Sequence, residues 1–314
     1  MNILITGVAG FIGSHLAQYL IKDNNHIFGV DNLLTGNKKN IESLLNNPLF
    51  TFIEKDLLSC DLSTVPSCDL IFHLASPASP IQYKKYPIET LMVNSLGTKN
   101  VLDFMRKTNS KTFVITSTSE IYGDPLVHPQ IETYWGNVNP NGIRSCYDES
   151  KRFAESLVMT YYRKYNLDVR VARLFNTFGP NMEQNDGRVV SNFILQAIQN
   201  KPITIYGDGN QTRSFCYISD MIEGLNQLAI TKNISGEVVN LGNPNEKTIL
   251  ELANQIRTIS SSSSKIIYTP IDQDDPKKRK PDITKAKKLL NWKPLILLEE
   301  GLKKTITYFT NELI

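Results

Sequence analysis

The sequence lacks any long hydrophobic run. No window reaches the roughly 18 apolar residues that a membrane-spanning helix needs. Residues 1–7 enter an apolar stretch without a preceding basic region, so no targeting segment is visible. We therefore do not expect a membrane to be a partner.

Paired cysteines are also lacking, and net charge is low. The four cysteines, Cys60, Cys68, Cys146 and Cys216, show neither CxxC pairs nor metal-ligand spacing. Reduced thiols and no metal site are expected. The formal net charge is only +3, too small for binding based on phosphate neutralisation, so nucleic acid is not an expected partner. Together with the missing targeting segment, these features favour a cytoplasmic protein.

Apolar segments of strand length alternate with amphipathic helical segments in the first half of the chain. Strands are predicted at 2–6, 27–31, 50–54, 70–74, 112–117 and 169–174, and helices at 11–22, 87–107 and 147–165. Such alternation is typical of parallel strands joined by crossover helices, so we predict an α/β fold with a doubly wound parallel sheet. After Phe178, glycine and proline interrupt the pattern and the helices shorten. The polar, proline-bounded segment 272–281 is predicted to be a loop.

A glycine-rich segment, TGVAGFIG at residues 6–13, lies between the first predicted strand and the first predicted helix. Gly7 permits a tight turn, Gly10 lets the backbone approach a pyrophosphate, and Gly13 lets the helix pack against the sheet. The helix N-terminus attracts the phosphates. Asp31 ends the next strand, where a carboxylate binds ribose hydroxyls and repels a 2′-phosphate, which favours NAD over NADP. A purely structural turn is the alternative, but the strand–turn–helix–strand–acid order favours a Rossmann-like dinucleotide site.

A phenol and an ammonium, Tyr147 and Lys151, are four residues apart and share one face of a predicted helix. The cation and a positive nicotinamide are expected to lower the phenol pKa, so that Tyr147 removes a hydroxyl proton while hydride leaves the same carbon. The preceding strand ends in Thr118, Ser119 and Glu120, where open α/β sheets bind ligands. Either hydroxyl can bond the same substrate group, and Glu120 can handle a proton at the next carbon. The alternatives are a helix cap for Glu120 and an exposed pair on the helix.

Long motifs resemble the extended short-chain dehydrogenase/reductases that act on nucleotide sugars. The general motifs are TGxxGxxG, HLA at 73–75, YxxxK at 147–151 and LNWKP at 290–294. Longer stretches are similar to the UDP-glucuronate decarboxylases of that family and lie at 73–80, 117–125, 134–136, 175–180, 185–193 and 273–282. The dTDP-glucose 4,6-dehydratases carry Asp-Glu where this chain has Ser119-Glu120, and 4-epimerases usually lack the Glu. A serine does not readily expel a sugar hydroxyl, so dehydration is disfavoured.

The resemblance implies NAD-dependent decarboxylation of UDP-glucuronate to UDP-xylose through a 4-keto intermediate, with NAD regenerated in each turnover. It implies an NAD-binding domain over 1–175, joined by part of 214–242, and a mainly nucleotide-sugar-binding lobe over 176–314. Tyr147 would serve the C4 step, and Glu120 would act later, at C5 or in holding the sugar. It also implies a homodimer formed through the helices that begin near Pro87 and Tyr147. Their apolar residues extend beyond one stripe and include Leu91, Val93, Leu96, Val101, Phe153, Leu157, Tyr161 and Tyr162.

The expected site residues fall into three sets. The catalytic set is Thr118, Ser119, Glu120, Tyr147, Lys151 and Arg213. The cofactor set is Gly7, Gly10, Phe11, Ile12, Gly13, Asp31, Asn32, Thr35, Gly36, Asp56, Leu57, Leu74, Ala75, Tyr147 and Lys151. The substrate set is Ser76, Pro77, Asn176, Arg188, Tyr206, Arg213 and Arg279. Two positions depart from the family: Asn37 where a basic residue is common, and Glu183 where histidine is common.

Two other functions remain as alternatives. The same site can support a neighbouring nucleotide-sugar reaction, either 4-epimerisation or 4,6-dehydration. A dinucleotide-binding protein without catalysis is the second, since a fold alone does not establish a function. The presence of Ser119, Tyr147 and Lys151 together favours an enzyme, because a sensor does not need all three.

Overall fold

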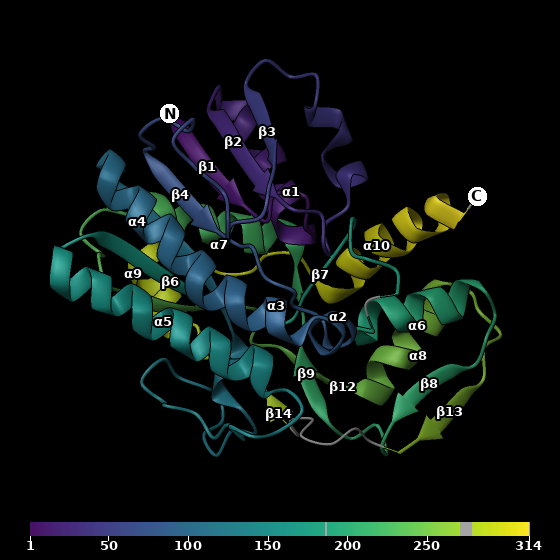
Figure 1. Ribbon diagram of the computed structural model, residues 1–314. Coiled ribbons are helices and arrows are strands. Elements are labelled where there is room, and N and C mark those ends of the chain that lie inside the picture. The colour runs from purple at the N-terminus through teal and green to yellow at the C-terminus, as the bar shows by residue number, and fades with distance from the viewer. Residues whose placement is uncertain (186, 271–277, 314) are drawn as a thin grey trace.

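The computed structural model describes residues 1–185, 187–270 and 278–313 (Figure 1). Within this part of the chain, the central sheet has seven strands in the order β11-β6-β5-β4-β1-β2-β3. The strands are β1 (Asn2–Thr6), β2 (His26–Asp31), β3 (Phe50–Glu54), β4 (Leu70–His73), β5 (Thr112–Thr118), β6 (Asp168–Leu174) and β11 (Val238–Leu241). Neighbouring strands pair in parallel. The predicted Rossmann-like α/β fold is therefore confirmed.

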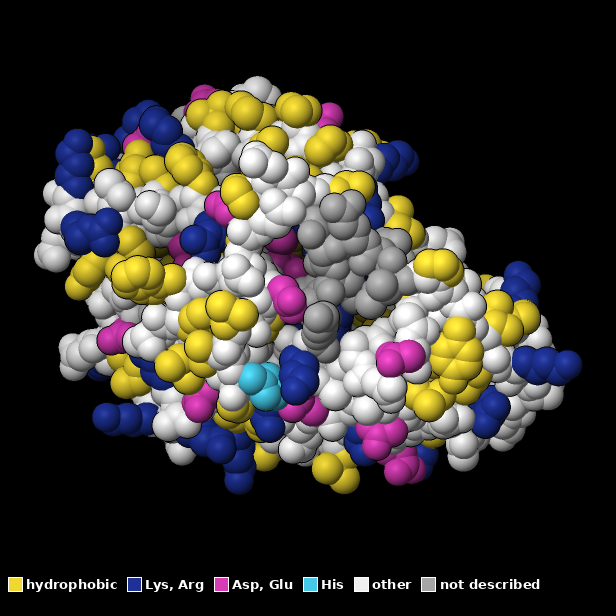
Figure 2. Space-filling view, turned by 90° about the horizontal axis from the view of Figure 1, so that it is seen from below, with side chains coloured by type: hydrophobic (Ala, Val, Ile, Leu, Met, Phe, Trp, Pro, Cys, Tyr) yellow, Lys and Arg dark blue, Asp and Glu magenta, His cyan; other side chains and the backbone are white. Residues whose placement is uncertain are grey.

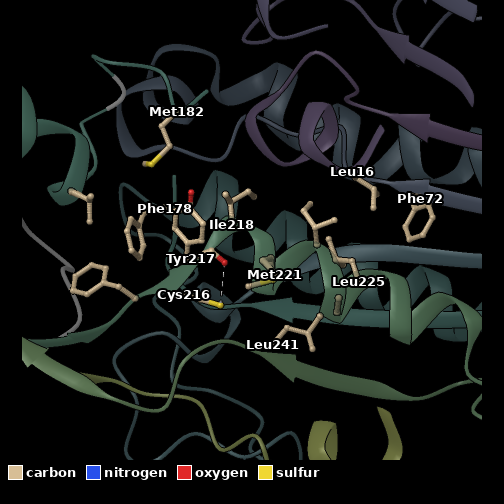
Figure 3. Close-up of a cluster of buried hydrophobic side chains, with 14 of the residues drawn as sticks. Leu16, Phe72, Phe178, Met182, Cys216, Tyr217, Ile218, Met221, Leu225 and Leu241 are labelled. Carbon is tan, nitrogen blue, oxygen red and sulfur yellow. Dashed lines mark hydrogen bonds between the residues drawn. The ribbon is translucent and has the colours of Figure 1, made fainter. Parts of the chain in front are cut away.

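Helices cover both faces of this sheet (Figure 1). One layer contains α1 (Phe11–Leu20), α7 (Ile218–Ile230) and α9 (Thr284–Leu290), and the other contains α3 (Pro87–Met92), α4 (Thr98–Thr108) and α5 (Ser145–Tyr165). Because side chains alternate along a strand, Ile3 and Ile5 of β1 join the first core while Leu4 joins the second. Figure 3 shows the first core, where Leu16 of α1 lies near Met221 and Leu225 of α7.

The helix predicted over 87–107 is divided in the structure. A π-helical segment, η3 (Val93–Gly97), separates α3 from α4. The Asn94 amide donates to Thr90 O at 3.0 Å, and Thr98 Oγ1 donates to Asn94 O at 2.9 Å. These local bonds satisfy backbone carbonyl groups that the wider π-turn leaves without an α-helical partner. Residue periodicity alone does not predict this turn. Single π-turns of this kind are frequent near functional sites.

A smaller group of elements, named the smaller lobe, lies beside the carboxyl ends of the central strands. It contains α6 (Val189–Ile198), α8 (Ile249–Ile259), α10 (Leu298–Leu313), the pair β8 (Ile203–Tyr206) and β13 (Ile266–Thr269), and a three-stranded sheet of β12 (Glu246–Thr248), β9 (Thr212–Ser214) and β14 (Lys278–Arg279). A short pair, β7 (Thr177–Phe178) with β10 (Cys216–Tyr217), joins the two parts. Short helical segments are η1 (Ile21–Asp23), η2 (Lys38–Leu44), α2 (Pro80–Lys85) and η4 (Ser119–Tyr122). Most of the predicted loop 272–281 lies outside the described residues.

The partners expected from the sequence can be compared with the surface charge, the helix composition and the possible metal ligands. In a view from below, acidic and basic side chains are interspersed around a hollow in this face (Figure 2). Among the described residues, no helix combines the length and apolar character needed to cross a membrane. In the same ranges, no group of His, Cys, Asp and Glu side chains is arranged to hold a metal ion.

Candidate active site

A cavity of about 630 Å³ opens beside the carboxyl ends of β1, β4, β5 and β6, and residues of the smaller lobe line its other side. A second cavity of about 90 Å³ lies beside the ends of β2 and β3. Gly7 and Gly10 line both cavities. The cleft therefore runs along the glycine-rich turn, which is where open α/β sheets bind dinucleotides.

The glycine-rich turn fits closely against its neighbours. Gly7 has a φ of +74°, and a Cβ there would lie 2.8 Å from the Ala75 backbone. A Cβ at Gly13 would lie 2.1 Å from the Gly7 carbonyl oxygen, so α1 can approach the turn only with glycine at this position. Helix α1 begins without a side-chain cap. The N–H groups of its first turn are thus available to an anion such as a pyrophosphate.

The carboxylate at the end of β2 is held by backbone groups. Asp31 Oδ2 accepts a hydrogen bond from Ala9 N at 2.9 Å, and Oδ1 accepts one from Leu33 N at 2.8 Å. Burial raises the pKa of Asp31, and these two bonds oppose that rise. Each oxygen retains a second lone pair for a ribose hydroxyl. Nearby, Asn32 Nδ2 donates to Asp56 Oδ2 at 2.9 Å, which fixes the acid at the adenosine end of the cleft.

The structure brings the whole predicted cofactor set to the two cavities. Residues at the larger cavity are Gly7, Gly10, Phe11, Ile12, Gly13, Thr35, Leu74, Tyr147 and Lys151. Residues at the smaller cavity are Gly7, Gly10, Asp31, Asn32, Thr35, Gly36, Asp56, Leu57, Leu74 and Ala75. Ser76 lines both, whereas Pro77 lines only the smaller one and so lies on the cofactor side. Asn37 and Glu183, the two residues that differ from those common in the family, also line the larger cavity.

Tyr147 and Lys151 are both buried at the base of the larger cavity. The Lys151 ammonium donates to Thr116 O at 2.9 Å, and the Tyr147 ring stacks on Tyr83 with centroids 5.0 Å apart. Burial raises the pKa of Tyr147 to about 12, although its hydrogen bond with Thr118 lowers it. Without a bound cofactor, burial outweighs the favourable charges, and the lowering of this phenol pKa beside a positive nicotinamide stays a prediction. Burial also lowers the pKa of Lys151, to about 8.

Glu120 is held between two arginines. Its carboxylate forms ion pairs with Arg144 through Oε2 and with Arg279 through Oε1. Arg279 also donates to Gly123 O at 3.1 Å and approaches Ser119 Oγ at 3.5 Å. Burial alone would raise the pKa of Glu120, but the two guanidinium charges outweigh it and lower this pKa to about 2. The side chain is therefore a carboxylate throughout the neutral pH range.

Most of the predicted substrate residues line the larger cavity. These are Ser76, Asn176, Arg188, Tyr206 and Arg213. Arg213 is buried on β9, Tyr206 is exposed at the end of β8, and Arg188 immediately precedes α6. Arg279 differs, because the structure places it behind Glu120 and outside the cavity lining. A diphosphate contact from Arg279 would require this guanidinium to leave the carboxylate.

Three further residues at the site were not predicted from the sequence. Arg144 pairs with Glu120, and Tyr83 stacks on Tyr147. Asp148 is buried, and burial followed by the charge of Glu120 raises its pKa to about 7. Arg144 had a detectable signal, since it stands three residues before Tyr147 and at the start of the same helix. No local pattern indicates the stacked tyrosine.

This fold and this Tyr-Lys site with a glycine-rich cleft define an extended short-chain dehydrogenase/reductase. A profile of the GDP-mannose 4,6 dehydratase family matches residues 4–305. UDP-glucuronic acid decarboxylase 1 of Arabidopsis thaliana is 50% identical over 314 residues, covering 100% of this chain and 71% of the plant protein. The Danio rerio protein of the same name is 52% identical over 312 residues, covering 99% and 73%. The chain therefore belongs to the UDP-glucuronic acid decarboxylase family, which confirms the resemblance seen in the motifs.

Solved structures agree on the fold. UDP-glucose 4-epimerase of Thermotoga maritima, solved with UDP-glucose, superposes with a TM-score of 0.92 at 30% identity and full coverage of both chains. UDP-glucuronic acid 4-epimerase of Bacillus cereus, solved with UDP-glucuronic acid and NAD, gives a TM-score of 0.90 at 32% identity over 99% of this chain and 100% of the other.

Proposed function

We propose that this protein is an NAD-dependent enzyme that decarboxylates UDP-glucuronate to UDP-xylose. Relatives with about 50% sequence identity are named UDP-glucuronic acid decarboxylases. A structural relative was solved in complex with UDP-glucuronic acid and NAD. NAD fits the residues present, because the uncapped helix α1, the tight Gly7 turn and Asp31 form a cleft for its pyrophosphate and ribose. When bound, NAD accepts a hydride and later returns it.

The observation that carries the choice of reaction is the ionised Glu120 beside Tyr147. Dehydration requires an acid that protonates a departing hydroxyl. Glu120 cannot be that acid at neutral pH, since Arg144 and Arg279 keep it ionised. Asp148, with a pKa near 7, lies outside the lining of the larger cavity. Decarboxylation needs no such acid, because the neighbouring ketone accepts the electrons.

In the proposed reaction, Tyr147 removes the C4 hydroxyl proton as hydride leaves C4. The resulting 4-ketone is β to the C6 carboxylate, so the bond between C5 and C6 breaks and carbon dioxide leaves. A proton from water is taken up at C5, and return of hydride to C4 with return of the Tyr147 proton to O4 then gives UDP-xylose. Lys151 provides positive charge beside Tyr147, and Ser119 or Thr118 bonds the C4 oxygen. Arg188 and Arg213 offer positive charge to the diphosphate.

Two parallel incubations, one with UDP-glucuronate and one with UDP-glucose, separate this proposal from its alternatives. Purified protein with UDP-glucuronate and NAD should release one carbon dioxide for each UDP-xylose formed. Formation of UDP-galacturonate without carbon dioxide would indicate 4-epimerisation instead. Loss of water from UDP-glucose, which carries the C6 hydroxyl that UDP-glucuronate lacks, would indicate 4,6-dehydration in the parallel incubation. Binding of NAD without any conversion of the sugar would support a sensor.

We predict that NAD binds more tightly than NADP by about tenfold or more, because the Asp31 carboxylate would face the 2′-phosphate and juxtaposed like charges are costly. Isothermal titration of the protein with both dinucleotides measures the difference. Asp31→Ser should reduce it. Tighter binding of NADP by the unaltered protein would show that Asp31 has a different role.

We also propose a homodimer formed through α3, η3 and α5. These segments pack side by side, and they expose Ile88 (64%), Leu91 (38%), Leu96 (38%) and Phe153 (52%). Two residues of the expected set do not belong to this surface, because Val101 and Tyr161 are buried in the core. Val93, Leu157 and Tyr162 are partly buried. An exposed apolar face on adjacent helices needs a second surface to cover it.

The dimer gives a measurable prediction. Light scattering of the unaltered protein at micromolar concentration should report twice the 35.5 kDa chain mass. Phe153→Glu should shift the protein towards the monomer by placing charge in the apolar contact. Tyr268→Glu is the matched control, since Tyr268 is similarly exposed (54%) but lies on β13 in the other lobe. A monomer mass for the unaltered protein would contradict the dimer.

A cytoplasmic location is also part of the proposal. It is supported by the four free cysteines, since thiols remain reduced in that compartment. Fractionation of cells that make the protein tests this, and recovery from a secretory fraction would overturn it.

A further inference from the structure

Three titratable side chains follow one another at intervals of four residues along α5. Tyr147, Lys151 and Glu155 therefore share one face of the helix, and α5 packs against β5 and β6. The first two residues line the larger cavity, whereas Glu155 lies behind them and outside the lining of both cavities. The proposed reaction does not yet assign Glu155 any role.

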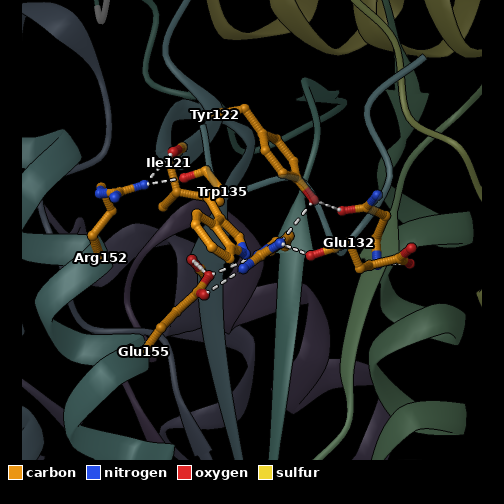
Figure 4. A network of polar contacts seen from close by, with 9 residues as sticks. Ile121, Tyr122, Glu132, Trp135, Arg152 and Glu155 are labelled. Atoms are coloured by element: carbon orange, nitrogen blue, oxygen red, sulfur yellow. Dashed lines mark hydrogen bonds and ion pairs between the residues drawn. The ribbon is translucent and has the colours of Figure 1, made fainter. Parts of the chain in front are cut away.

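The Glu155 carboxylate connects the helix to two neighbouring strands. Its Oε1 accepts hydrogen bonds from Ser117 Oγ at 2.5 Å and from Arg173 Nε at 3.0 Å, and its Oε2 accepts one from Arg173 Nη2 at 2.8 Å. Ser117 and Arg173 face each other in the register of β5 and β6. Arg173 also donates to the Tyr122 hydroxyl at 3.0 Å, so Glu155 and Tyr122 bind the same guanidinium (Figure 4). A forked, charge-assisted pair of this kind fixes geometry as well as charge.

The strand segment that Glu155 binds also carries contacts of the two proposed catalytic side chains. Thr116 O accepts the hydrogen bond from Lys151 Nζ at 2.9 Å. Thr118 forms the hydrogen bond with Tyr147. The contact of Glu155 falls on the residue between these two, so it holds the strand end at the point where both contacts are made.

Glu155 also affects the charge at the site. Lys151 is only 4% exposed, and a buried ammonium needs a nearby negative charge to remain protonated. Burial lowers the pKa of Lys151 to about 8, and the Glu155 carboxylate opposes this lowering. Tyr147 on α5, Arg173 on β6 and His73 on β4 are the other titratable groups close by. His73 is neutral, since burial and the charge of Lys151 lower its pKa to about 3.

We propose that Glu155 is a positioning residue for the reaction: it fixes the end of β5 and supplies the negative charge that keeps Lys151 protonated beside Tyr147. Arg173 directs the Glu155 carboxylate through their ion pair, without removing the influence of the Glu155 charge on Lys151. This inference rests on the proposed function, in which Tyr147 and Lys151 carry out the C4 step.

The test compares Glu155→Gln with Glu149→Gln. Glu149 is on the same helix, but its side chain is 38% exposed beside Arg152, so the control removes the same charge from the surface. In Glu155→Gln, the alkaline limb of the kcat–pH profile should move to lower pH, with about a tenfold loss at pH 8 and a smaller loss at pH 6. Glu149→Gln should keep the unaltered profile. Glu155→Asp retains the charge and should keep the limb in place even if kcat falls.

A second readout does not depend on activity. NMR titration of lysines labelled at 13Cε, in protein without substrate and with the Lys151 signal assigned by its loss in Lys151→Arg, measures this pKa directly. The midpoint should fall in Glu155→Gln and stay constant in Glu149→Gln. An unchanged midpoint in folded Glu155→Gln overturns the inference. Absence of carbon dioxide release by the unaltered protein overturns the proposed function instead, while the titration still reports on Glu155.

Glu155→Gln leaves the Arg173 charge buried without its partner, which can prevent folding. If no cooperative melting transition is seen, the double variant Glu155→Gln/Arg173→Met removes both charges and is titrated in its place. Its Lys151 midpoint should also lie below that of the unaltered protein. A midpoint equal to that of the unaltered protein would show that Glu155 does not set the charge of Lys151.

Discussion

Tyr147→Phe should lower the conversion of UDP-glucuronate by at least about 10²–10⁴-fold, the range that general acid–base groups contribute. The phenylalanine keeps the stack on Tyr83, whose centroid lies 5.0 Å away, so the ring position should persist. What disappears is the oxygen that takes the C4 proton, and without it the first step has no base. Both NADH absorbance and carbon dioxide release should therefore be lost in single-turnover experiments.

The control for this loss is Tyr268→Phe, which removes a hydroxyl from an exposed tyrosine on β13 and should leave turnover unchanged. NAD affinity of Tyr147→Phe, measured by isothermal titration, should remain within about threefold of the unaltered protein, since the lost hydroxyl is one polar group among the many residues that line the cavity. Formation of NADH at a near-native rate in Tyr147→Phe would mean that the proton acceptor is another group.

The parts of the site that could be predicted from sequence are those in which neighbouring residues act together. The turn at 6–13 needs glycine for reasons of local geometry, such as the φ of +74° at Gly7. Asp31 closes the next strand, and the four-residue spacing of Tyr147 and Lys151 places both on one helical face. The alternation of strands and helices predicted the central sheet because each crossover is itself a local pattern.

Features that depend on distant parts of the chain could not be predicted in this way. The partner of Glu120 is Arg279, about half the chain length away, and no spacing rule joins them. The pKa of Tyr147 depends on burial, which only the assembled fold determines. The π-helical turn at 93–97 also escaped prediction, because the apolar residues continue the periodicity of a regular helix across it.

Glu120→Gln should separate C4 oxidation from decarboxylation. The glutamine keeps the size of the side chain, but it cannot neutralise Arg144 and Arg279. Arg144 lines the larger cavity, so its charge and that of Arg279 behind it then act on the substrate's carboxylate without a protein counterion. They would stabilise this group as an anion and oppose its departure as neutral carbon dioxide. The C4 step, at Tyr147, does not involve that group directly.

In single-turnover experiments with UDP-glucuronate, NADH formation by Glu120→Gln should therefore stay within about tenfold of the unaltered rate, while carbon dioxide release falls by about 10²-fold or more. The lowered pKa of Glu120 excludes proton donation by this residue at neutral pH, so of its two predicted roles we favour holding the sugar over transfer of a proton at C5. Equal loss of both signals would place Glu120 in binding or in the first step.

The same variant should lose stability, because removing one member of a buried ion pair typically costs about 3–5 kcal/mol. The sign of the pH dependence follows from the pKa. The pKa of Glu120 is lowered from 4.5 to about 2 in the fold, so its contribution is fully present above pH 4.5 and is lost as the pH falls towards 2. The difference in melting temperature between the unaltered protein and Glu120→Gln should thus be largest at neutral pH and should narrow below pH 4.5. A difference that stays constant across this range would show that the carboxylate charge does not stabilise the arginine pair.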